Sequence, residues 1–188
     1  MNPIIIIFVV AAVFFLIYTL AYNSLVRVQR KIQESWLEID VQLKRRYDLI
    51  PNLVNRIKES VTNEEELLNK IMTVRSQAME VPEGQIGDKA RIESLLSITL
   101  KSILDLDKSY LELNSNQSFN DFKGTLSEIK GQISAAQIIY NENVTQLNTK
   151  VQTSPLSIVA NIHGITSEEF FEIEEKEAVA PPPPPVQF

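Results

Sequence analysis

The feature that most constrains this chain is an uninterrupted apolar run from Pro3 to Tyr22. As an α-helix the run rises about 30 Å, the thickness of the hydrocarbon core of a bilayer. Tyr18 and Tyr22 lie where interfacial aromatic residues belong. A cleaved signal peptide would need basic residues before a shorter apolar core, whereas here the first charged residue is Arg27. We therefore predict an uncleaved transmembrane anchor over residues 1–26.

The charges on either side of the run predict its orientation. Only Met1 and Asn2 precede it, and neither side chain is charged. Arg27, Arg30 and Lys31 follow it closely. Because basic residues favour the cytoplasmic side of a membrane, we expect the N-terminus outside and the remaining domain in the cytoplasm.

Net charge is distributed unevenly along the rest of the chain. The sequence has 24 acidic and 18 basic residues, but residues 27–78 carry a net charge of +2 and residues 80–188 a net charge of −8. The part that follows the anchor therefore suits anionic headgroups, and the lipid bilayer is the first predicted partner. A strongly basic surface is absent, so we expect no nucleic-acid binding.

After the anchor, apolar residues continue at steps of three and four, which predicts a helix without a break from the membrane into the domain. No glycine or proline occurs between Tyr22 and Ile50. A proline removes a helical hydrogen bond, so we expect a kink or turn between Asp48 and Asn52. A new start is expected near residue 63, where Asn63 precedes three glutamates.

Two further long helices are predicted. The segment from Val81 to Gly87 is expected to be a loop, and a helix should then run from about Asp88 to Leu113. The last helix, from Phe119 to Val151, has the heptad spacing typical of coiled-coil packing. These patterns predict an all-α fold, with the transmembrane helix continuous with an antiparallel bundle of about four long helices over residues 27–153.

The C-terminal segment, residues 154–188, differs from the bundle. Ser154-Pro155 should end the last long helix, and a short helix is possible before Gly164. An acidic stretch and five consecutive prolines follow, and prolines favour an extended polyproline II conformation. Two interpretations remain open: a disordered tail, or a docking segment that ends in the apolar Phe188.

No pattern of residues indicates catalysis. The chain has no cysteine and a single histidine, His163, whereas a structural metal site needs three or four ligands. Glu-x-x-His pairs, glycine-rich phosphate loops and nucleophile elbows are all absent. We therefore expect no metal, no cofactor and no enzymatic activity.

The densest group of charges lies around the proline. Asp40 and Lys44 are four residues apart and Arg45 and Asp48 three apart, so each pair can form an ion pair along a helix. The side chains next to the proline could satisfy backbone groups that it leaves free. The candidate site, either a structural corner or a surface for self-association or a partner, comprises Asp40, Lys44, Arg45, Arg46, Asp48, Pro51 and Asn52.

The stretch from Ile39 to Asn55 resembles the signature of the LemA family. Further matches lie along the whole chain, at Tyr22-Asn23, Leu25-Val26, Trp36, Arg75, Asn116, Phe119, Tyr140-Asn141 and Val144. The sequence departs from the family at Gln137, Leu147-Asn148 and Ser154-Pro155, where Arg, Tyr-Asn and Phe-Pro are common. The resemblance implies a single-pass protein of the bacterial inner membrane, with a cytoplasmic helical bundle and no established enzymatic activity.

Two hypotheses of function follow from these patterns. The first is a scaffold that forms homo-oligomers and organises the membrane; a branch of the family in magnetosome-forming bacteria is associated with internal membranes. The second is an adaptor that recruits or regulates a membrane protease or secretion component through its C-terminal tail. Both rest on analogy, because a fold does not determine a function.

Overall fold

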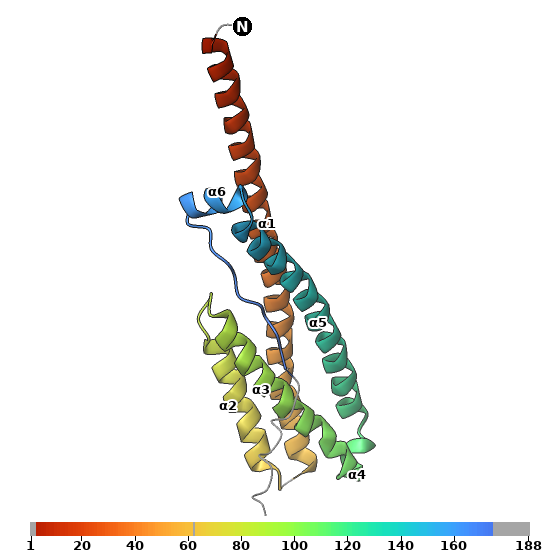
Figure 1. Cartoon of the computed structure of the whole chain (residues 1–188). Coiled ribbons are helices and arrows are strands. Elements are labelled where there is room, and N and C mark those ends of the chain that lie inside the picture. The colour runs from red at the N-terminus through yellow and green to blue at the C-terminus, as the bar shows by residue number, and fades with distance from the viewer. Residues whose placement is uncertain (1–2, 62, 175–188) are drawn as a thin grey trace, which may run out of the picture. The chain divides into compact units, whose positions relative to one another are not determined.

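The computed structural model describes residues 3–61 and 63–174, and within them the chain is all-α, as predicted. No strand occurs in these two stretches. The elements, shown in Figure 1, are α1 (Pro3–Ser60), α2 (Glu65–Glu80), α3 (Ile86–Leu104), the 3-10 helix η1 (Asp105–Lys108), α4 (Leu111–Asn114), α5 (Gln117–Gln152) and α6 (Leu156–Ile162). The proline run and Phe188 lie outside the described residues.

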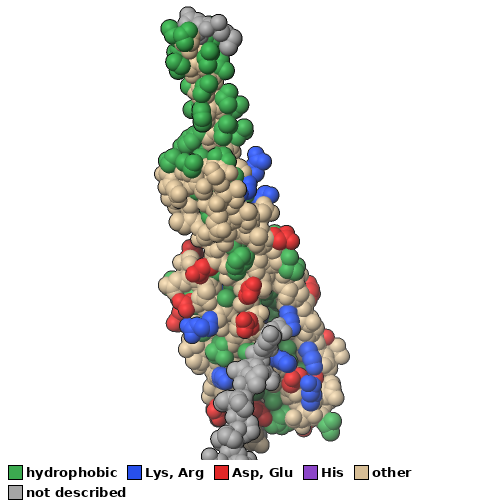
Figure 2. Space-filling model, viewed as in Figure 1, with side chains coloured by type: hydrophobic (Ala, Val, Ile, Leu, Met, Phe, Trp, Pro, Cys, Tyr) green, Lys and Arg blue, Asp and Glu red, His purple; other side chains and the backbone are tan. Residues whose placement is uncertain are grey.

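The first part of α1 buries almost none of its apolar surface within the chain. Phe8 and Phe14 are 71% and 69% exposed, and hydrophobic side chains cover much of the visible face of the segment in Figure 2. Leaving such side chains in water forgoes about 1.5–3 kcal/mol each. The helix is long and apolar enough to cross a membrane, which is consistent with membrane association.

Of the kink or turn predicted between Asp48 and Asn52, the turn is wrong, because α1 continues through Pro51 to Ser60. Proline has no N–H, so the carbonyl of Tyr47, four residues earlier, loses its helical donor. The Nε of Arg75, on α2, donates to that carbonyl oxygen at 2.7 Å. A side chain from another helix thus replaces the missing bond, and no turn is needed.

The chain divides into two compact units. The first comprises residues 3–45 and 128–171, and the second residues 46–61, 63–127 and 172–174. In the first unit α1 and α5 lie side by side and antiparallel, linked by bonds from Lys150 to Ser24, Asn143 to Ser35 and Arg45 to Gln132. Its core includes Leu25, Ile39, Leu43, Ile133, Tyr140, Val144 and Leu147.

In the second unit, the end of α1 packs with α2 and α3 around an apolar core of Ile50, Leu53, Ile57, Leu68, Ile71, Leu96 and Ile103. The predicted helix start near residue 63 and the loop before α3 are confirmed. The long third helix is wrong, because α3 ends at Leu104. Carboxylates are unfavourable at a helix C-terminus, and Asp105 and Asp107 follow there.

We expect Arg75→Ala to lower the free energy of unfolding by about 1–3 kcal/mol, because a half-buried carbonyl loses its donor. Pro51→Ala restores an N–H that can donate to Tyr47. In the Pro51→Ala background, Arg75→Ala should lower the free energy of unfolding by a smaller amount. The difference is the coupling energy between positions 51 and 75, and we expect about 0.5 kcal/mol or more. A double-mutant cycle by urea unfolding in detergent measures the coupling, and the exposed Arg91→Ala is the control. If Arg75→Ala lowered the free energy of unfolding equally with Pro51 and with Ala at position 51, Arg75 would not be replacing the bond that the proline removes.

Candidate functional site

The charge cluster predicted around the proline is only partly present. Lys44 and Asp40 form the predicted ion pair at 2.7 Å, on the surface. The predicted pairing of Arg45 with Asp48 is wrong. Arg45 donates instead to Gln42 at 3.2 Å and to Gln132 at 3.3 Å, because α5 offers a polar partner beside it.

Asp48 and Asn52 do not have the predicted role beside Pro51. Both side chains are exposed, and the carbonyl that the proline leaves free is satisfied by Arg75. Arg46 is the residue of the cluster that is buried, with 4% of its surface exposed. The cluster therefore separates into surface charges and one buried cation.

Arg46 belongs to a buried ionic cluster in the second unit. Its guanidinium donates to Glu93, which is 0% exposed, and to Ser97 at 3.0 Å. The hydroxyl of Tyr47 also donates to Glu93. Lys89, whose Nζ lies 3.8 Å from Glu93, donates to the carbonyl of Ala78 at 2.7 Å. Two cations therefore surround one carboxylate, and hydrogen bonds link α1, α2 and α3.

Sequence reasoning missed Lys89 and Glu93. On α3 the aliphatic Leu95 is 37% exposed. The buried face includes Leu96, Thr99 and Ile103 instead. Lys89 and Glu93 share the 3-4 spacing of this face, and their separation of four residues was the available signal.

A second arrangement, in the first unit, holds an extended C-terminal segment, residues 166–171, on α5. The side-chain amide of Asn141 donates to the carbonyl of Phe171 at 2.9 Å and accepts from its N–H at 3.0 Å. Asn148 makes the same pair of bonds with Glu168, at 3.0 and 2.9 Å. We call Asn141 and Asn148 the asparagine clamp.

The spacing of the clamp matches the dimensions of the two backbones. Asn141 and Asn148 are seven residues apart, so they share a face of α5 and are separated by about 10.5 Å of helical rise. From Glu168 to Phe171 an extended chain covers about 10 Å. Each side-chain amide can therefore bond the backbone of one residue, Glu168 or Phe171. These bonds require an extended backbone and do not depend on which side chains the segment carries.

An aromatic anchor completes this site. Phe171 is fully buried, and its ring meets Trp36 edge-on at 5.2 Å between centroids. Tyr140 lies 5.6 Å from Trp36 and donates its hydroxyl to the carbonyl of Glu169 at 3.1 Å. Burial, followed by the charges of Glu168 and Glu169, raises the pKa of Tyr140 to about 12, so the hydroxyl keeps its proton and remains a donor.

The sequence model of the LemA family matches residues 35–188, which include Trp36, Pro51, Arg75 and both asparagines of the clamp. The chain belongs to the LemA family. No curated protein matches it significantly. The part of this LemA chain that precedes residue 35, including the apolar segment of α1, lies outside the match.

The LemA family is not known as a family of enzymes. Within residues 3–61 and 63–174 of this member, no three side chains among His, Cys, Asp and Glu gather as a metal ion would require. What the geometry offers is recognition: a helical surface that holds an extended backbone through amides and anchors one aromatic side chain.

Adjacent arginines allow a matched test of the buried cluster. Arg46→Met leaves the fully buried Glu93 without its closest cation, and we expect a loss of about 3–5 kcal/mol in the free energy of unfolding. Arg45→Met removes an exposed charge and should cost less than about 1 kcal/mol. Urea unfolding followed by circular dichroism measures the free energy of unfolding of both variants. Similar decreases in the two would show that the buried ionic cluster contributes little to stability.

The asparagine clamp can be tested by proteolysis. Asn141→Ala and Asn148→Ala each remove two hydrogen bonds that contribute about 1 kcal/mol apiece. A glutamate-specific protease should then cut after Glu168 and Glu169 roughly thirtyfold faster, because the segment opens more often. Glu142→Ala, an exposed change on the same helix, is the control and should leave the rate unchanged. Equal rates in all variants would exclude a role for the clamp.

Proposed function

We propose that this protein is a non-enzymatic scaffold, anchored in the bacterial cytoplasmic membrane with its helical domain in the cytoplasm, that assembles with copies of itself. The observation that supports assembly is a group of four large aliphatic side chains that remain in solvent on the paired helices. Leu37 and Val41 on α1 are 62% and 50% exposed, and Ile138 and Ile139 on α5 are 60% and 55% exposed.

These four side chains, which we call the aliphatic surface, lie at one level of the first unit. On α1 they fall between Ser35 and Arg45, and on α5 between Gln132 and Asn143. Hydrogen bonds join Ser35 to Asn143 and Arg45 to Gln132, so both pairs of residues belong to the same stretch of the helix pair. Single exposed aliphatic residues are common, but a group of this size is typical of an interaction surface.

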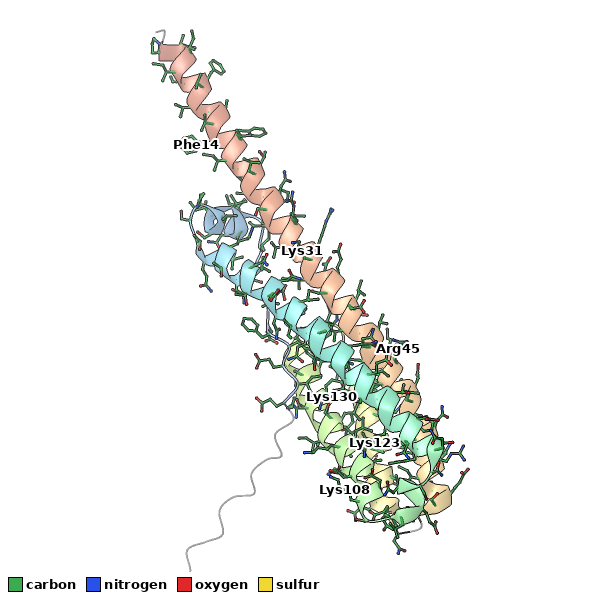
Figure 3. The ribbon with its side chains drawn as sticks, turned by 90° about the vertical axis from the view of Figure 1, so that its right-hand side faces the viewer. Phe14, Lys31, Arg45, Lys108, Lys123 and Lys130 are labelled. Atoms are coloured by element: carbon green, nitrogen blue, oxygen red, sulfur yellow. The ribbon has the colours of Figure 1, made fainter. Side chains whose placement is uncertain are left out.

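The charges near the membrane support the orientation and the lateral arrangement. Arg27, Arg30 and Lys31 are exposed where α1 leaves its apolar segment, and Figure 3 labels Lys31 on this part of the helix. Cations at this level favour anionic headgroups on the cytoplasmic side. Anchoring confines the copies to two dimensions, which raises their effective concentration for contact through the aliphatic surface.

The asparagine clamp favours a second candidate function, an adaptor for another membrane protein. The clamp holds the chain up to Phe171, and the N–H of Glu174 donates to the hydroxyl of Ser94 at 2.9 Å, so the segment is held as far as residue 174. The residues that follow are acidic and proline-rich, a composition that suits docking to a partner. A membrane protease or a secretion component is the class of partner we expect.

Native mass measurement in mild detergent tests the scaffold. We expect a homo-oligomer that dissociates in the Leu37→Glu/Ile138→Glu variant, because charges replace the aliphatic contacts. Leu111→Glu, at a side chain that is 83% exposed in the second unit, is the matched control and should remain assembled. A monomeric unmodified protein would contradict the proposal.

The same preparation separates the two functions. Removal of residues 175–188 should leave the assembly intact if the aliphatic surface holds it together. If the protein is mainly an adaptor, this truncation should instead abolish co-purification of a membrane-protein partner. A truncation that changes neither property would remove the support for the adaptor.

A further inference from the structure

Helix α6 lies across α1 where the exposed apolar segment ends. Figure 1 shows α6 from the side, and Figure 3 shows it end-on. The axis of α6 therefore runs crosswise to that of α1. The hydroxyl of Tyr18 is 2.7 Å from Nε2 of His163, which follows α6, and the ring of Tyr22 stacks on the same histidine at 4.4 Å between centroids. Two aromatic residues of α1 therefore hold the end of α6.

The local geometry ends α6 at that contact. Gly164 adopts a φ of +65°, a left-handed conformation that suits glycine, and the N–H of Ile165 returns to the carbonyl of Ala160 at 2.9 Å. Val159 and Ala160 are buried, as is Ala21 on α1. The inner face of α6 therefore packs on the first unit, and its position relative to the apolar segment is defined.

The outer face of α6 carries no charge; it has two large aliphatic side chains, with the exposed Asn161 between them. Ile158 and Ile162, one helical turn apart, are 58% and 64% exposed. No aspartate, glutamate, lysine or arginine occurs between Lys150 and Glu168. A water-exposed helix would ordinarily place charged residues on this face.

The dimensions of a bilayer indicate what covers this face. Residues 3–17 of α1, whose side chains are exposed, rise only about 22 Å, whereas the hydrocarbon core is about 30 Å thick. The remaining distance corresponds to residues 18–22, which is the level where α6 contacts α1. If the apolar run matches the membrane, α6 reaches the acyl-chain boundary.

We propose that α6 is an interfacial helix that lies in the membrane surface, with Ile158 and Ile162 inserted among lipid acyl chains. The chemistry fits a lipid partner, because the outer face exposes Ile158 and Ile162 without any charge and the cations Arg27, Arg30 and Lys31 follow on α1 at headgroup level. This inference rests on the proposed membrane anchoring. It adds that the domain touches lipid through a second element.

The chain has no cysteine, so a single introduced cysteine carries a single spin label. We would label Ile162→Cys and, separately, Ile158→Cys in the full chain, reconstituted in vesicles of phosphatidylcholine and phosphatidylglycerol. Collision with oxygen, which partitions into lipid, is compared with collision with a water-soluble nickel chelate. Phe14→Cys, on the apolar segment labelled in Figure 3, and Leu111→Cys, at a side chain that is 83% exposed in the second unit, are the controls.

We expect the oxygen-to-nickel ratio at positions 158 and 162 to be several-fold higher than at position 111 and lower than at position 14, which lies deeper in the bilayer. Ratios at 158 and 162 equal to that at 111, with a lipid-exposed label at 14, would overturn the interfacial helix and leave the anchor in place. A water-exposed label at position 14 would overturn the proposed anchoring, and the interfacial helix with it.

Discussion

The bond from Arg75 to the carbonyl oxygen of Tyr47 is the interaction on which the course of α1 depends. Without it, Pro51 would leave a half-buried acceptor unsatisfied in the middle of a helix, a situation that usually produces a kink. With it, one helix contains the membrane-spanning candidate and contributes to both compact units. The proline also makes the carbonyl available, so proline and arginine act as complementary parts of one contact.

The same stretch of α1 supplies the buried ionic cluster. Arg46 and Tyr47 both donate to Glu93, and the backbone of Tyr47 accepts from α2. Such buried charges are weak sources of stability, because desolvation offsets much of the attraction. Their value lies in specificity: an alternative packing of α3 that turned Glu93 elsewhere would leave buried cations without their carboxylate.

In the first unit, polar side chains serve a different purpose. The asparagine clamp binds the backbone of residues 166–171 and does not depend on their side chains, whereas Phe171 fills an aromatic site beside Trp36. Helices otherwise present few groups that can pair with an extended chain, because their own backbone donors and acceptors are occupied. Asn141 and Asn148, seven residues apart, provide that pairing, because each side-chain amide both donates a hydrogen bond to the segment and accepts one from it.

The apolar run, the helical periodicity and the boundaries near residues 63, 81 and 154 were readable from sequence, because they depend on local composition and spacing. The effect of Pro51 was not, since it depends on Arg75, a residue distant in sequence. The burial of Glu93 was not predicted, since it depends on Arg46, which α1 places against it. Local patterns therefore determined which segments are helices, whereas tertiary packing decided which polar groups are buried, because a buried polar group needs a partner that only the fold can bring to it.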